Sequence, residues 1–142
     1  MKRFISILLA VLFAAMLAGC GRGEENTDPV GKYVLKSIDG KSVETLVREQ
    51  YGSEGSGYEN AELEELLERA GIGSVDEYMT IELKADGTTE ANSVTGEHDV
   101  GSWKREGDKI SVTSNGETAQ ITIKGGELSF TYLDSKYVFI KK

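Results

Sequence analysis

The chain has 142 residues, and its 24 acidic residues against 16 basic ones give a formal net charge of −8 at pH 7. A surface with this charge repels phosphate groups, so we expect no nucleic-acid partner. Because Cys20 is the single cysteine and His98 the single histidine, the chain cannot form an intramolecular disulfide or a histidine metal cluster. With no nucleophile elbow or phosphate-binding motif either, we expect no metal, no cofactor and no enzymatic activity.

The first 20 residues have the pattern of a bacterial export signal. Lys2 and Arg3 form a charged start, and the apolar run at residues 4–16 is shorter than the ~20 residues that a helix needs to cross a bilayer. Residues 17–20, Leu-Ala-Gly-Cys, resemble the lipobox of bacterial lipoproteins. The resemblance implies that residues 1–19 are removed and that the Cys20 thiol carries a diacylglycerol. The protein would then be extracytoplasmic and lipid-anchored to a bacterial membrane; the alternative is an ordinary secretory signal with a coincidental cysteine.

The residues after the signal divide into a tether and one domain. Residues 20–29 are polar, acidic and without periodicity, which predicts a flexible tether. Residues 30–142 are long enough for a single domain with its own core, and we expect a monomer. The first predicted strand, at residues 32–38, places Tyr33 and Leu35 on one face and Val34 and Ile38 on the other.

A helical insert at residues 43–70 interrupts the strand pattern. It consists of a short helix at residues 43–51, a glycine-rich break at 52–57 and a second helix at 60–70. In the second helix Leu63, Leu66, Leu67 and Ala70 follow the i, i+3, i+4, i+7 spacing of one apolar face. Asn60 would cap this helix at its start and Gly71 would end it. We expect the apolar face to cover one end of a barrel as a mobile lid.

Seven further strands are predicted after residue 78 from apolar residues at every second position. The third of them, at residues 98–105, carries Val100 and Trp103, and we expect Trp103 to be a buried anchor. Turns are expected at Asp86-Gly87 and at residues 134–135. His98 lies among polar residues, which favours a surface position over a role as a general base. Eight short strands at such even spacing indicate a sandwich or an up-and-down barrel.

Four short motifs resemble those of the small lipocalin-like lipoproteins of bacteria. They are Gly-Lys-Tyr at 31–33, Leu-Lys-Ala-Asp-Gly at 83–87, Gly-Ser-Trp at 101–103 and Gly-Asp-Lys-Ile at 107–110. The resemblance covers residues 30–142 and implies an all-β, eight-stranded antiparallel up-and-down barrel with a pocket for a small apolar ligand. The chain departs from typical lipocalins at Tyr33, where they carry tryptophan.

Two functions remain open from the sequence. The first is a binding module that captures a small hydrophobic molecule. Its candidate lining residues are Tyr33, Leu35, Ile81, Leu83, Trp103, Phe130 and Tyr132. The alternative is a structural or protein-interaction module of the cell envelope, whose barrel is filled by its own side chains. A barrel of eight strands is just wide enough for either outcome.

Overall fold

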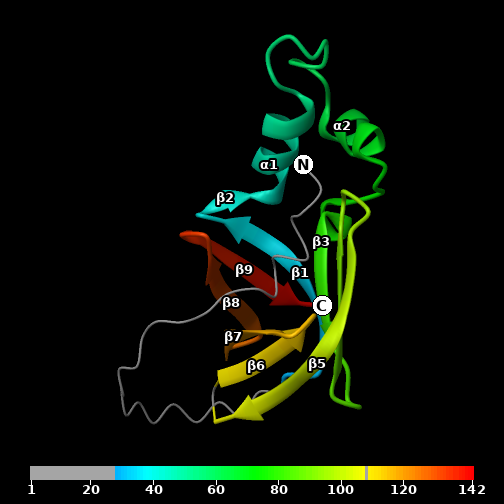
Figure 1. Cartoon of the computed structure of the whole chain (residues 1–142). Coiled ribbons are helices and arrows are strands. Elements are labelled where there is room, and N and C mark those ends of the chain that lie inside the picture. The colour runs from blue at the N-terminus through cyan, green and yellow to red at the C-terminus, as the bar shows by residue number, and fades with distance from the viewer. Residues whose placement is uncertain (1–27, 108) are drawn as a thin grey trace.

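The computed structural model describes residues 28–107 and 109–142 (Figure 1). The predicted signal sequence, Cys20 and most of the predicted tether lie outside these residues. The helices are α1 (Val43–Tyr51), α2 (Leu63–Ala70) and the 3-10 helix η1 (Val75–Glu77). The strands are β1 (Gly31–Ile38), β2 (Lys41–Ser42), β3 (Met79–Leu83), β4 (Thr88–Ser93), β5 (His98–Glu106), β6 (Lys109–Ser114), β7 (Glu117–Lys124), β8 (Glu127–Tyr132) and β9 (Ser135–Lys141).

Strands β1 and β3–β9 form a closed antiparallel barrel over the described residues. Each strand pairs with its neighbour in the chain, and β1 closes the sheet by pairing with both β3 and β9. The two-residue β2 pairs with the end of β1 and does not enter the barrel. The all-β, eight-stranded, lipocalin-like up-and-down barrel expected from the sequence is confirmed.

The inward-facing residues of the strands form one apolar core. Tyr33 and Leu35 of β1 face Ile81 of β3 and Phe139 of β9, in agreement with the alternation of the sequence. This core continues around the barrel through buried side chains on every strand from β3 to β9 except β5, which contributes the half-buried Trp103.

The prediction for the end of β1 was wrong at one residue. The pairing of β1 with β9 shifts between Leu35 and Ser37, where a β-bulge adds one residue to β1. The bulge reverses the alternation, so Ile38 pairs with the inward-facing Tyr137 and packs against the core. Ile38 therefore shares the face of Leu35 rather than that of Val34.

Helix α1 spans the residues that its sequence predicts, while α2 begins three residues later. Ser42 caps α1 by accepting a hydrogen bond from the Thr45 amide. The N-cap of α2 is Glu62 rather than Asn60, because the Ala61 carbonyl is bound by Arg48 of α1 and the chain turns before it becomes helical. Gly71 ends α2 in the left-handed conformation, as predicted.

The insert lies at the end of the barrel where β1 stops and β3 starts (Figure 1). Helix α1 contacts α2, β1 and β2. Val47 of α1 and Leu66 and Leu67 of α2 are buried and join the same apolar core as the strands. This end of the barrel, toward which β1, β4, β6 and β8 run, is called the helical end below.

The turn between β8 and β9 differs from the expected one. Tyr132 pairs with Ser135, so the two turn residues are Leu133 and Asp134 rather than residues 134–135. Both have positive φ angles, of 45° and 66°, which is the conformation of a type I′ turn. The same conformation occurs at Asn115-Gly116, where the residue types favour it.

Candidate functional site at the helical end of the barrel

All seven predicted lining residues lie on the inner side of the barrel. Six of them, Tyr33, Leu35, Ile81, Leu83, Phe130 and Tyr132, are buried in the apolar core. Trp103 is half-buried and packs against this core. The prediction that they face the inside of the barrel therefore agrees with the structure, while contact with a ligand stays a prediction.

The middle of the barrel is filled by side chains. Tyr33 and Leu83 have 0% of their surface exposed, as do Leu128 and Phe139. A side chain with no exposed surface does not border a space that would hold a water molecule. The Tyr33 hydroxyl donates a hydrogen bond of 2.7 Å to the Pro29 carbonyl, so its polar group is satisfied by the chain itself.

Trp103 lies toward the end of the barrel opposite the insert, against the β3–β4 turn. Its indole Nε1–H donates to the Lys84 carbonyl at 2.8 Å, and its backbone amide donates to the Gly87 carbonyl at 2.8 Å. Both acceptors belong to the β3–β4 turn, so Trp103 fixes this turn on the barrel. The side chain is half-buried rather than the buried anchor that the sequence predicts, because it lies at the rim.

Val100 and Trp103, which the sequence assigns to one strand, lie on opposite faces of β5. They are an odd number of positions apart, and Val100 is 56% exposed on the outer face. The residue that faces inward at this level is Asp99, which is buried. Sequence reasoning missed Asp99 because no apolar pattern identifies a carboxyl group in a core.

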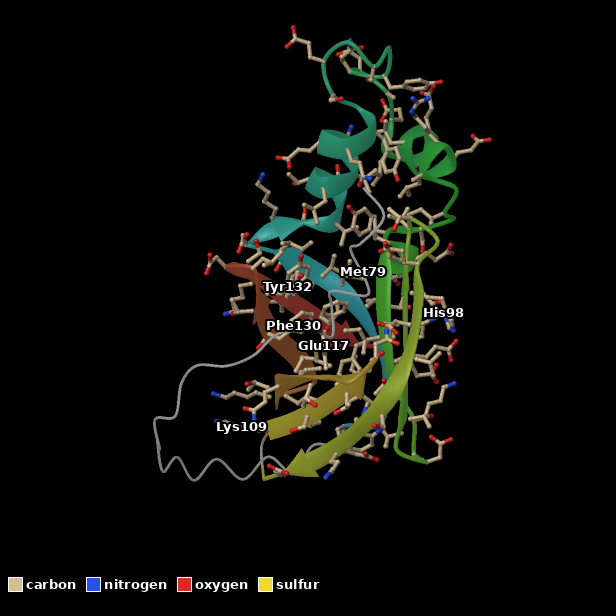
Figure 2. All side chains as sticks on the ribbon, viewed as in Figure 1. Met79, His98, Lys109, Glu117, Phe130 and Tyr132 are labelled. Carbon is tan, nitrogen blue, oxygen red and sulfur yellow. The ribbon has the colours of Figure 1, made fainter. Side chains whose placement is uncertain are left out.

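Aromatic side chains gather at the helical end of the barrel. The Phe130 ring stacks on Tyr137, with centroids 5.2 Å apart, and on Phe139, with centroids 5.9 Å apart. Figure 2 shows Phe130 and Tyr132 along β8 and Met79 at the start of β3. Each of these three residues retains a small exposed fraction, unlike the fully buried side chains in the middle of the barrel.

The tyrosine hydroxyls at this end lie near one another and near acidic groups. Burial raises the pKa of Tyr78, and the hydroxyls of Tyr51 and Tyr137 raise it further. Burial also raises the pKa of Tyr137, with smaller contributions from Tyr132 and Asp39. These shifts hold the hydroxyls in their neutral form, in which each can donate or accept a hydrogen bond.

The insert is tied to this end by one of the hydroxyls. Tyr78 donates a hydrogen bond of 2.9 Å to Oε1 of Gln50, which lies in α1. Among the described residues, the hydroxyls of Tyr132 and Tyr137 have no hydrogen-bond partner within the chain. They remain available to a polar group that reaches this end of the barrel.

The hydrogen-bonded pairing between β7 and β8 is short beside Tyr132. Between the described strands β7 and β8 the pairing stops at Thr122 and Ser129, after three residue pairs. The rest of β7 pairs only with β6, and the rest of β8 only with β9. Phe130 and Tyr132 follow directly after this break, so β7 and β8 can separate there without breaking sheet hydrogen bonds.

His98 lies on the outer surface, away from the candidate site (Figure 2). Its Nδ1 is 2.7 Å from Asn92 Oδ1 and 3.7 Å from Glu90 Oε1. Within the described residues, no three His, Cys, Asp or Glu side chains are grouped in a way that could hold a metal ion. No helix in that part of the chain is both long and apolar enough to span a membrane.

Similarity to known proteins is confined to solved structures. No family model and no curated protein matches this sequence. A DUF4847 family protein from Bacteroides vulgatus superposes with a TM-score of 0.48 at 14% identity, over 84% of this chain and 98% of that one. An uncharacterized protein from Bacteroides eggerthii superposes with a TM-score of 0.45 at 17% identity, over 81% of this chain and 100% of that one. Because both TM-scores lie below 0.5, the fold described above rests on the strand pairing of this chain, and neither similarity bears on function.

Proposed function

We propose that the protein is a lipid-anchored, extracytoplasmic envelope protein that binds a small apolar or amphipathic molecule at the helical end of its barrel. The observation that carries this proposal is the break between β7 and β8 beside Phe130 and Tyr132. An apolar molecule that entered there would contact these aromatic rings without breaking sheet hydrogen bonds. Binding sites are typically apolar with a few convergent polar groups, and the tyrosine hydroxyls supply the polar groups.

The proposed anchor is consistent with the place where the domain begins. Residues 28–30 precede β1 at the end of the barrel opposite the insert. They are held there by the Tyr33 hydroxyl on the Pro29 carbonyl and by Lys141 Nζ on the Asp28 carbonyl at 2.8 Å. A tether from a lipidated Cys20 would therefore reach the domain at this opposite end and leave the helical end directed away from the membrane.

Binding is tested with a neutral apolar probe on the purified mature domain. N-phenyl-1-naphthylamine fluoresces more strongly when it leaves water, so we expect a saturable rise in its emission with the native protein. Tyr132→Ala should weaken binding by about tenfold, since it removes one aromatic wall worth roughly 1.4 kcal/mol. Thr131→Ala, the exposed neighbour on β8, serves as the matched control and should bind normally.

The absence of saturable binding by natively folded protein would refute the ligand-binding half of the proposal. It would favour the second candidate function, an interaction module with a filled barrel. The observation that favours this candidate is the fully buried middle of the barrel, with Tyr33, Leu83 and Phe139 at 0% exposure. Such a barrel would be a rigid support, and its outer face and the insert would contact the partner protein.

The anchor is tested separately by fractionation of cells that express the full chain. Cys20→Ser should release the protein from the membrane fraction and remove the added mass of the acyl chains, because it removes the thiol to which the lipid would be attached. Ser42→Ala, a substitution in the folded domain, is the control and should leave attachment unchanged. A Cys20→Ser protein that stays with membranes at the same mass would contradict lipidation at this residue.

A further inference from the structure

The carboxyl group of Asp99 is the one polar group of the described interior that lacks a full set of partners. Its residue is 8% exposed, and it lies on the inward face of β5 between the outward-facing His98 and Val100. Oδ1 accepts hydrogen bonds from Ser114 Oγ at 2.7 Å, from Asn115 Nδ2 at 3.3 Å and from the Val100 amide at 3.0 Å. Oδ2 is buried and has no hydrogen-bond partner within the described residues.

This arrangement leaves one oriented acceptor that is buried. Three donors on Oδ1 hold the carboxyl group in place, so the direction of Oδ2 is set by the protein. A buried acceptor without a donor destabilises the folded chain, and such groups are uncommon in native structures. We therefore expect Asp99 to have a function that accounts for this loss of stability.

Asp99 belongs to the same end of the barrel as the tyrosines. Its partner Ser114 pairs with Glu117 across the β6–β7 turn. Burial raises the pKa of Tyr132 on β8, and the charge of Glu117 raises it further, so the two side chains are near enough to interact electrostatically. The carboxyl group, Glu117 and Tyr132 thus follow one another around the helical end, on both sides of the break between β7 and β8.

The negative charge of this region favours one class of polar group on a bound molecule. Two carboxyl side chains, Asp99 and Glu117, are present, and no hydrogen bond or ion pair within the described residues joins either to a lysine or arginine. Acceptors of this kind favour a cationic N–H donor and disfavour a carboxylate or phosphate, because a charge-assisted hydrogen bond is stronger than a neutral one. The aromatic ring of Tyr132, which interacts with Glu117 electrostatically, also attracts a cation.

We propose that Asp99 Oδ2 is the anchor for the ammonium group of an amphipathic amine, whose apolar part lies against Phe130 and Tyr132. This inference rests on the proposed ligand-binding function and specifies the class of ligand. The amine would donate to Oδ2 when the side chains at the β7–β8 break move apart, and its N–H group would supply the donor that the folded chain lacks.

The test is displacement of bound N-phenyl-1-naphthylamine by three eight-carbon competitors that differ only in the head group. Octylamine should compete about tenfold better than octanol, and octanoate should compete worst, since a charge-assisted hydrogen bond is worth at least this ratio. In Asp99→Asn the preference for octylamine should vanish while octanol binding persists. Glu106→Gln, which removes one negative charge at the far end of β5, is the control and should keep the preference.

A second measurement covers the case in which Asp99→Asn folds poorly. Octylamine should raise the melting temperature of the unmodified protein more than octanol does at equal concentration, because it supplies the missing donor to Oδ2. Equal competition by octylamine and octanol, or an amine preference that survives in folded Asp99→Asn, would overturn the inference and leave the proposed function standing. Failure of the probe and of all three competitors to bind would overturn both.

Discussion

At the scale of single residues, the turn between β8 and β9 contains a conformational conflict. Leu133 has a φ of 45°, in the left-handed region, and its side chain is 72% exposed. Most residues with a Cβ carry a steric cost of about 1–2 kcal/mol in this region; glycine has no Cβ, and asparagine tolerates the conformation because its short polar side chain can hydrogen-bond locally. Because its side chain is mostly exposed, Leu133 gains little stability from burial to offset this steric cost.

Replacement of this leucine should therefore stabilise the domain. We expect Leu133→Asn to raise the free energy of unfolding by about 1 kcal/mol, as measured by urea denaturation followed by circular dichroism. Leu133→Ala is the matched control: it removes the exposed side chain without relieving the left-handed strain, so its effect should be small. If both variants change the stability equally, the conformational explanation is wrong.

At the scale of elements, the β7–β8 break and the insert should be the parts of the domain that open most easily. In a pair of antiparallel strands, every second residue pair is joined by backbone hydrogen bonds. In β7 and β8 these are the pairs Lys124–Glu127 and Thr122–Ser129, and the next pair in the series would be Gln120–Thr131. That pair is absent from the ladder. The amides of Gln120 and Thr131 are thus left without a strand partner at this edge.

Hydrogen exchange by NMR tests this feature at single residues. The amides of Gln120 and Thr131 should exchange faster than those of Thr122 and Ser129, which lie on the same strands within the ladder. The comparison needs no variant, because each strand contains its own control. Equal protection at all four amides would mean that β7 and β8 are held together along their whole length in solution.

The insert is predicted to be a lid that opens while the barrel stays folded. Leu66, 1% exposed, is the most deeply buried residue of α2. Leu66→Asp should detach α2 and increase exchange in α1 and α2, because a carboxylate is unfavourable in this site, while the strand signal in circular dichroism persists. The exposed Glu64→Asp on the same helix is the control. Loss of the strand signal in Leu66→Asp would show that the insert is a fixed part of the core.

At the scale of the whole molecule, the buried tyrosines determine how stability depends on alkaline pH. Burial raises the pKa of Tyr33, Tyr78, Tyr132 and Tyr137 above the ordinary value of 10.0. A folded-state pKa above the unfolded one means that the unfolded chain loses its protons first as the pH rises. The stability that these groups contribute is thus fully present below about pH 10 and decreases above it.

We therefore expect the urea midpoint to be constant from about pH 7 to 9 and to fall steeply above about pH 10. The absorbance of ionised tyrosine, followed in parallel, should rise together with unfolding rather than before it. Tyr78→Phe should flatten the alkaline decline, because it removes one of the shifted groups. Titration of all tyrosines near pH 10 in the folded protein would contradict the burial of these hydroxyls.

The amino-acid sequence by itself determined those features that depend on neighbouring residues. Alternating apolar residues and Gly, Asn or Asp turns located all eight barrel strands, and the residues of α1 followed from the local helical pattern. The inward positions of Tyr33, Ile81 and Phe130 followed from the same alternation. These properties are local because successive side chains of a strand point to opposite faces, so the face of a residue follows from its position along the strand.

The tertiary structure decided the features that depend on residues far apart in the chain. The bulge that turns Ile38 inward exists because β1 must pair with β9, about one hundred positions later, and the Lys136 amide donates to Asp39 across this contact at 2.7 Å. The burial of Asp99 depends on Ser114 and Asn115 of the next hairpin. The β7–β8 break lies where the rest of β7 pairs only with β6 and the rest of β8 only with β9. Local pattern cannot encode such pairings, since closure constrains all the strands together.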